Sequence, residues 1–268
     1  MHKVALALVV TACSVTEPPA PTSDTCESNV VPMVTTRVDG VADTQVVPIV
    51  VDGRDAWLAI DTGSQRTFVF RDEYEEDAAV LTIGCEQRSV PGYGEAGIGV
   101  EEFEGKPILG ILGLEFFGDV GEIDYPGGTI TRHASLPADV ARLPHAPFVN
   151  RDDRGLVDLE IDAVPVRMML DTGAPSTLWL GVEGNEGDER GQVQTADGRL
   201  WDVWFGQGEI ALAGERRVVP VTRGLAIPYI GPELEELGAQ GLLGVTSLGW
   251  RRFVWDTPNG LIYFDARR

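Results

Sequence analysis

The tripeptide Asp-Thr-Gly occurs twice in this chain, at residues 61–63 and 171–173, and each copy ends an apolar run typical of a β-strand. The residues before the two copies also align without a gap, 47–60 on 157–170. A single Asp-Thr-Gly would be ordinary turn chemistry, because Asp and Gly are common turn residues. A repeat that extends into the flanking strands instead indicates two related halves, each ending a strand in a carboxylate.

Two further elements repeat downstream in the same order. Gly-Ile-Leu-Gly-Leu at residues 110–114 returns as Gly-Leu-Leu-Gly-Val at 241–245, and Asp-Tyr-Pro-Gly-Gly at 124–128 returns as Asp-Thr-Pro-Asn-Gly at 256–260. The Asp-Thr-Gly copies are 110 residues apart, whereas these elements are 131 and 132 apart, so the second half carries longer loops. The order predicts a duplicated unit, and therefore two lobes in a chain of 268 residues.

The two aspartates, Asp61 and Asp171, have the chemistry of a shared acid and base. Two carboxyl groups within hydrogen-bonding reach cannot both ionise at low cost, so the pair keeps one proton over a wide pH range. The ionised member can take a proton from a water molecule, while the protonated member polarises a substrate carbonyl. Such a pair would hydrolyse a peptide bond without a covalent intermediate.

In these motifs, over roughly residues 46–264, the chain resembles the aspartic peptidases of the pepsin and retropepsin type, with two lobes fused in one polypeptide. In that family each lobe supplies one Asp-Thr-Gly loop and later two apolar residues followed by glycine, here residues 111–113 and 242–244. The resemblance implies an all-β, bilobal acid-protease fold, with an active-site cleft between two pseudo-twofold-related, barrel-like lobes. It also implies an endopeptidase without cofactor or metal, and aspartic proteases are the standard case of a carboxyl pair with split pKa values.

The resemblance assigns supporting roles to the residues that follow the two aspartates, namely Thr62, Gly63, Ser64, Thr172, Gly173 and Ala174. Glycine permits the turn and lets backbone N–H groups approach a carboxylate, and in the family the threonine hydroxyls brace the two loops against each other. The loops differ in Ser64 and Ala174, where pepsin-like chains usually carry Ser or Thr in both lobes. If the Ser64 hydroxyl donates a hydrogen bond to Asp61, that carboxyl is the more acidic member of the pair.

Two segments are candidates for a flap over the cleft. The first is the glycine-rich stretch 90–99, with Tyr93 as a contact for bound peptide. Its glycines fit the G-x-G-x-x-G dinucleotide pattern, but Pro91 and a strand-like continuation argue against the helix which that pattern requires. The second candidate, around Asp197 and Gly198, resembles the flap of retropepsins. A flap and an ordinary glycine-rich loop fit the first segment equally well, and the number of flaps stays open.

Short, branched or alternating runs bounded by Gly, Pro or Asp predict an all-β chain. The predicted strands are 46–51, 56–60, 67–70, 156–161, 166–170, 209–212, 218–221 and 261–264, and the best helix candidates are 137–142 and 232–237. Prolines between residues 136 and 150 mark the lobe boundary. We therefore predict an N-terminal lobe over 46–136, a linker over 137–150 and a C-terminal lobe over 151–268.

The first residues have the character of a targeting segment. A basic start and a short apolar run predict a signal peptide over residues 1–12, too short to span a bilayer. Residues 10–13 resemble a bacterial lipobox, in which Cys13 becomes the lipidated first residue, and 13–45 has the composition of a flexible tether. A conventional secretory signal is the alternative. Both place the protein outside the cytoplasm, and the first predicts a lipid anchor in the periplasm or outer membrane.

Cysteine content and charge add further expectations. With Cys13 acylated, Cys26 and Cys85 remain, and both a disulfide and two free thiols fit this number in an oxidising compartment. The net charge of −21 disfavours nucleic acid as a partner and favours a soluble monomer. This negative field should also raise the pKa values of the aspartate pair and favour cationic or neutral peptides, an effect that salt would screen.

Other chemistries find no support in the sequence. The three histidines have no metal-ligand spacing, and the chain contains neither a P-loop nor a G-x-S-x-G elbow. We therefore predict an extracytoplasmic aspartic endopeptidase in which Asp61 and Asp171 activate water for attack on a peptide or protein substrate. A catalytically silent peptide-binding or scaffold lipoprotein on the same fold is the competing function. Two intact aspartates favour the enzyme, because a catalytically inactive site does not need both carboxyl groups.

Overall fold

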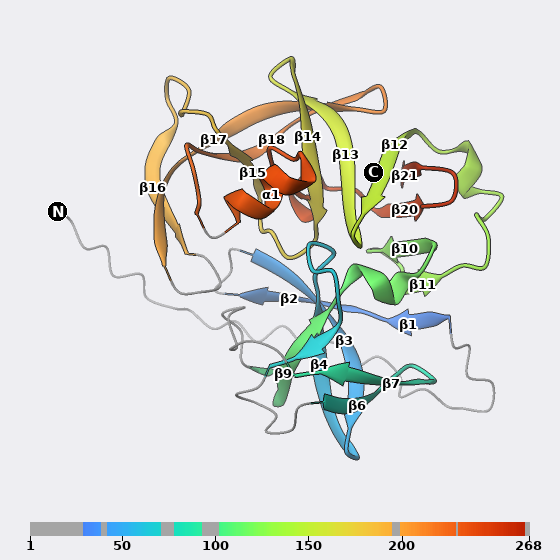
Figure 1. Cartoon of the computed structure of the whole chain (residues 1–268). Coiled ribbons are helices and arrows are strands. Elements are labelled where there is room, and N and C mark those ends of the chain that lie inside the picture. The colour runs from blue at the N-terminus through green and yellow to red at the C-terminus, as the bar shows by residue number, and fades with distance from the viewer. Residues whose placement is uncertain are drawn as a thin grey trace.

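The computed structural model describes residues 29–38, 42–70, 78–92, 102–194, 199–228 and 230–265, and strands dominate it (Figure 1). The first half contains β1 (Val30–Pro32), β2 (Val34–Val38), β3 (Ala42–Val51), β4 (Arg54–Ile60), β5 (Phe68–Val69), β6 (Ala78–Ile83), β7 (Glu86–Pro91), β8 (Glu102–Phe103), β9 (Lys106–Leu112), β10 (Val120–Asp124) and β11 (Thr129–Arg132). The second half contains β12 (His145–Arg151), β13 (Arg154–Ile161), β14 (Val164–Asp171), β15 (Thr177–Leu180), β16 (Glu189–Gln194), β17 (Leu200–Leu212), β18 (Glu215–Gly224), β19 (Gly241–Gly244), β20 (Arg252–Asp256) and β21 (Leu261–Asp265). The helical elements in these residues are α1 (Gly231–Leu237) and the 3-10 turns η1 (Leu114–Phe117), η2 (Val140–Arg142) and η3 (Val245–Leu248). Within the same ranges, no helix has the length and apolar character needed to cross a bilayer.

The N-terminal lobe is a mixed sheet built around β4. Its order in the described residues is β5-β9-β4-β3-β6-β7, and β2 and β8 pair with β3 and β9. β4 runs antiparallel to β3 and parallel to β9, with Ile60 opposite Leu112. Both faces of β4 are covered, since Leu58 and Ile60 pack in one apolar cluster and Trp57 and Ala59 in another. Its end is therefore buried from Ala56 to Ile60, and its apolar residues do not alternate with polar ones. This strand leads directly into Asp61.

The C-terminal lobe repeats this arrangement around β14. β14 runs antiparallel to β13 and parallel to β19, with Asp171 opposite Gly244. A second pairing of β13, with β17, turns the sheet back on itself and makes the lobe barrel-like. Close strand contact explains the repeated glycine motif, since a Cβ on Gly110 or Gly241 would lie 2.0 or 1.9 Å from a backbone carbonyl oxygen of the next strand. Only glycine permits that approach.

Strands from both halves join the lobes in one sheet with the order β1-β11-β10-β20-β21-β12 (Figure 1). The central pair, β10 and β20, comes from the repeated segments and is antiparallel, with Glu122 opposite Val254 at its midpoint. These two positions are equivalent in the repeat, so an approximate twofold axis passes between them. Glu122 is buried and binds the Arg252 guanidinium, with Oε1 2.5 Å from Nε. The duplicated strands therefore hold the lobes in a symmetric arrangement.

Strands also occur where the sequence predicts a tether or a linker. β1 and β2 lie within residues 13–45, and β12 begins inside the linker predicted over 137–150. Distant partners explain β1 and β12, because β1 pairs with β11, and β12 pairs first with β21 and then with β13. β2 instead pairs with the next strand, β3. Pro147 is the last residue of β12 opposite β21, so its missing N–H falls where the strand changes partner.

The other predicted elements agree with the structure in most cases. Each predicted strand overlaps an observed one, and the predicted helix at 232–237 is α1. The predicted helix at 137–142 is only the turn η2, because Leu143 precedes Pro144 and is extended, with ψ 156°.

Candidate active site

The two Asp-Thr-Gly loops lie against each other where the lobes meet. Asp61 follows β4 and Asp171 ends β14, and their carboxyl groups share a hydrogen bond. Asp171 is 8% exposed, and Asp61 is partly exposed. The structure thus brings two carboxyl groups that are 110 residues apart in sequence into one site.

Thr62 and Thr172 brace the two loops through four hydrogen bonds. The Thr62 N–H donates to Thr172 Oγ1 (3.0 Å), and the Thr172 N–H donates to Thr62 Oγ1 (3.1 Å). Each hydroxyl also donates to the strand before the opposite aspartate, Thr62 to the Leu170 carbonyl and Thr172 to the Ile60 carbonyl, both at 3.1 Å. Both threonines are buried. Since every one of these bonds crosses between the lobes, the geometry of the aspartate pair depends on both halves.

Gly63 and Gly173 leave room for the opposite carboxyl group. A Cβ on Gly63 would lie 2.8 Å from Asp171 Cγ, and a Cβ on Gly173 would lie 2.9 Å from Asp61 Cγ. Either added carbon would push the carboxyl groups apart. The Gly63 N–H also donates to Asp61 Oδ1 (2.8 Å). Both glycines therefore permit the close approach of the pair.

Burial raises the pKa of both carboxyl groups above the usual aspartate range. For Asp171, the charge of Asp61 and the hydrogen bond with it raise the pKa further, well above that range. For Asp61, the hydrogen bond with Asp171, the N–H groups of Gly63 and Ser64, and the Arg154 guanidinium offset part of the rise in pKa. This arrangement favours the shared proton on Asp171 and the charge on Asp61.

The residue after each Asp-Thr-Gly differs between the loops. The Ala174 N–H donates to Asp171 Oδ1 (2.9 Å). The Ser64 hydroxyl donates to the carbonyl of Arg66 (3.0 Å) and not to Asp61, so the hydroxyl bond considered from the sequence is not formed. Serine hydroxyls readily form hydrogen bonds with backbone groups two residues away, and here that bond forms in place of one to the Asp61 carboxyl. The difference in pKa within the pair therefore has other causes.

A buried arginine beside the pair, Arg154, was missed by the sequence analysis. Arg154 begins β13 and is 9% exposed. Burial lowers the pKa of its guanidinium, and the charges of Asp61 and Asp171 oppose that change. The repeat does mark this position, because Arg154 is equivalent to Thr44, each 17 residues before its aspartate. A charged residue in one half, where the other half has a neutral one, could have identified Arg154 as a candidate site residue.

Several predicted site residues lie outside the described part of the chain, namely Cys13, Cys26, Tyr93, Asp197 and Gly198. Cys85 lies in the turn between β6 and β7 and is disulfide-bonded, so the alternative of two free thiols is wrong. Its pairing with Cys26 stays a prediction. In the part of the chain that the structure describes, no three His, Cys, Asp or Glu side chains gather as metal ligands.

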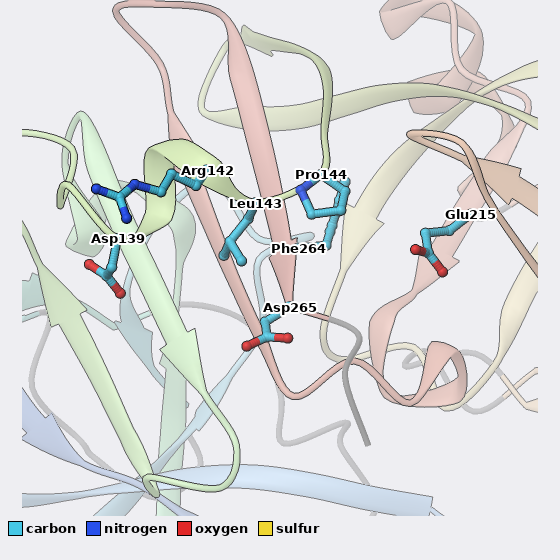
Figure 2. A pocket seen from close by; sticks show the side chains of 7 residues that line it. All are labelled: Asp139, Arg142, Leu143, Pro144, Glu215, Phe264 and Asp265. Atoms are coloured by element: carbon cyan, nitrogen blue, oxygen red, sulfur yellow. The ribbon is translucent and has the colours of Figure 1, made fainter.

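A hollow of about 630 Å³ lies outside the Asp-Thr-Gly loops. Figure 2 shows its lining, which consists of Asp139, Arg142, Leu143, Pro144, Glu215, Phe264 and Asp265. Asp139 binds Arg252, with Oδ2 2.7 Å from Nη1, and this bond lowers the pKa of its carboxyl. Neither member of the aspartate pair lines this hollow, and its charges are typical of a solvated acidic surface.

A second hollow, of about 740 Å³, lies along β16 and β17. Its lining includes Arg190, Trp201, Trp204 and Leu225, and the Arg190 guanidinium lies 5.6 Å from the centroid of the Trp204 ring. The second flap candidate lies between these two strands in the sequence. Its lining also contains Glu183, Gln192 and Asp202, and neither member of the aspartate pair lines it.

The fold is that of the aspartic proteinases. An aspartic proteinase from Irpex lacteus is 14% identical and has a TM-score of 0.51, over 88% of this chain and 96% of that chain. Basic 7S globulin from soybean is 10% identical, with a TM-score of 0.47 over 89% of this chain and 95% of that chain. No family model and no curated protein matches the chain. At 14% identity, the likeness to the Irpex lacteus enzyme shows the bilobal, all-β fold alone.

Proposed function

We propose that this protein is an aspartic endopeptidase in which Asp61 and Asp171 activate a water molecule. One observation carries the proposal: two carboxyl groups from opposite lobes, Asp171 buried and Asp61 partly exposed, share a hydrogen bond. Burial and mutual repulsion make such a pair unfavourable for folding, and turn geometry does not require it. Titratable groups whose pKa values are strongly perturbed concentrate at catalytic sites.

The proposed mechanism follows from the two protonation states. Asp61, the charged member, accepts a proton from a water molecule, and Asp171 donates a hydrogen bond to the carbonyl oxygen of the peptide bond. The water oxygen adds to the carbonyl carbon to give a tetrahedral intermediate. The C–N bond then breaks as the nitrogen takes a proton from the pair. One water is consumed, one carboxyl and one amine are formed, and the pair is left with the single proton with which it began.

Substrate and location are part of the same proposal. The two tryptophans of the second hollow, Trp201 and Trp204, would accept a bulky apolar side chain of the substrate. We place the enzyme outside the cytoplasm, anchored through a lipid on Cys13. The support is the lipobox-like sequence at residues 10–13 together with the disulfide at Cys85, since structural disulfides persist in oxidising compartments. Cys13→Ser should move the protein from the membrane fraction to the soluble fraction.

The test is cleavage of a mixed peptide library at acid and neutral pH, with and without pepstatin. We expect cleavage by the wild type, and a loss of about a hundredfold or more in both Asp61→Asn and Asp171→Asn. Asp158→Asn is the matched control, because Asp158 forms an exposed ion pair with Arg167 and should leave cleavage unchanged. If the wild type retains peptides but cleaves none, the catalytically silent peptide-binding lipoprotein replaces the enzyme.

A further inference from the structure

Arg154 is the first residue of β13, and Asp171 is the last residue of its antiparallel partner β14. The register of the two strands begins with Leu156 opposite Met169, so Arg154 and Asp171 both lie two residues beyond this pair, at the same end of the hairpin. Of the carboxylates that act on the guanidinium through their charge, Asp61 and Asp171 have the largest influence. Arg154 therefore lies at the edge of the proposed catalytic site.

The hydrogen bonds of Arg154 are incomplete. Its Nη2 donates to the carboxylate of Glu233, in the first turn of α1. Its Nε and Nη1 are buried, and among the residues that the structure describes they have no hydrogen-bond partner. A guanidinium carries five N–H donors, and native proteins rarely leave buried donors without an acceptor. These two nitrogen atoms therefore require an explanation.

A structural ion pair does not provide that explanation. The aspartates that act on Arg154 through their charge are Asp61, Asp152, Asp153 and Asp171. None of them accepts a hydrogen bond from Nε or Nη1. The side chain of its one bonded partner, Glu233, is 44% exposed, so water can solvate that carboxylate if it leaves the arginine. The unused donors indicate an acceptor that comes from outside the chain.

We propose that Arg154 determines specificity by binding a carboxylate of the peptide substrate close to the scissile bond. This inference rests on the function proposed above for the same site. The incoming carboxylate replaces Glu233 at Nη2 and also binds Nη1, because a guanidinium binds a carboxylate best through two parallel N–H donors. Glu233 keeps the buried arginine charge paired before the substrate binds.

This local preference opposes the electrostatic field of the whole chain. The net charge of −21 repels acidic peptides, and salt screens that repulsion. Arg154 acts on a single substrate position through direct bonds in a buried setting, which salt screens much less. A preference for one acidic position that survives at high salt therefore distinguishes Arg154 from the general field.

The experiment separates the two sources of a substrate carboxylate, an acidic side chain and a free C-terminus. Peptides that the wild type cleaves are remade with Glu or Gln at each position within about three residues of the cleaved bond, and with a C-terminal acid or amide. At high salt, at least one matched pair should differ, with kcat/KM higher by about tenfold or more for the charged peptide than for its neutral counterpart. A Glu preference identifies the side chain as the ligand, and an acid preference identifies the C-terminus.

Three variants test the role of Arg154 itself. In Arg154→Gln the ratio of kcat/KM between the charged and neutral peptides should fall close to one. In Glu233→Gln the ratio should rise several-fold, because no internal carboxylate then competes. Arg167→Gln removes an exposed arginine on the neighbouring strand and should leave the ratio unchanged. A wild-type ratio near one in both peptide sets, or a ratio that persists in Arg154→Gln, overturns the proposal.

A binding measurement keeps this proposal distinct from the proposed catalysis. Immobilised Asp61→Asn protein is offered random octapeptide mixtures in Glu and Gln versions, and in acid and amide versions, and the retained peptides are counted by mass spectrometry. The charged versions should be enriched, and the enrichment should vanish when Arg154→Gln is added. Equal retention overturns the proposal even if the wild type cleaves peptides. If Arg154→Gln does not fold, Glu233→Gln decides, since greater enrichment supports the proposal and unchanged enrichment contradicts it.

Discussion

Replacing Thr172 by valine should cost much more stability than its small change in shape suggests. Valine removes Oγ1, which accepts a hydrogen bond from the Thr62 N–H (3.0 Å) and donates one to the Ile60 carbonyl (3.1 Å). Thr62 is 0% exposed and Ile60 is 1% exposed, so water cannot replace the lost partner. Each lost bond costs about 0.5–1.5 kcal/mol, and a group left unsatisfied costs about 1–3 kcal/mol. Two groups left unsatisfied predict a decrease of about 2–6 kcal/mol, a large part of the roughly 5–15 kcal/mol that stabilises a typical protein.

Urea unfolding, followed by the fluorescence of the six tryptophans, measures this decrease in the free energy of unfolding. Thr172→Ser is the matched control, because it keeps the hydroxyl, and it should cost about 1 kcal/mol or less. The slope of the unfolding free energy against urea concentration should be the same in both variants as in the wild type, which checks that all three unfold in the same transition. A Thr172→Val variant within about 0.5 kcal/mol of the wild type would refute the reasoning, because the two bonds of the Thr172 hydroxyl would then not help to hold the lobes together.

Three further predictions concern the aspartate pair and the sheet that joins the lobes. Burial and Asp61 raise the pKa of Asp171, so the stability contributed by its protonated form is lost as pH rises through the folded pKa. Asp171→Asn cannot ionise and should flatten the fall in unfolding free energy above about pH 4, and an unchanged pH profile would contradict the raised pKa. Gly63→Ala would place Cβ 2.8 Å from Asp171 Cγ and should abolish cleavage. Gly231→Ala is the control and should leave cleavage unchanged, because its Cβ would meet nothing within 4 Å. If both variants cleave peptides, the two carboxyl groups need not be so close. Trp255→Ala removes a side chain that is 1% exposed and should cost about 3–5 kcal/mol in the same urea assay, while a cost below about 1 kcal/mol would show that the β10–β20 junction does not depend on it.

The fold could be predicted from the sequence because duplication leaves local signals. The strands before Asp61 and Asp171 are buried on both faces, so they appear as continuous apolar runs. Gly110 and Gly241 recur because a side chain at either position would collide with the neighbouring strand. Such constraints act within a few residues and can be read from a single chain.

Local sequence signals are missing where the partner of a residue is distant. β1 lies in the segment predicted as a tether, because its short sequence carries no strong strand signal and only its pairing with β11 makes it a strand. Ser64 is a different case, because its hydroxyl has two local acceptors, Asp61 and the Arg66 carbonyl, and the sequence does not show that it binds the carbonyl. Arg154 was missed because its neighbours, Asp61 and Glu233, are far away in the sequence.

The sequence by itself determined the two-lobed plan and which residues each lobe brings to the contact, because apolar periodicity and glycine placement report local burial and close backbone approach. Only the tertiary structure decided how far apart the carboxyl groups of Asp61 and Asp171 are, which of them holds the proton, and that Arg154 lies beside them. The physical reason is that these properties depend on distance and solvent exclusion between segments about 100 residues apart, and packing across the lobe junction sets both.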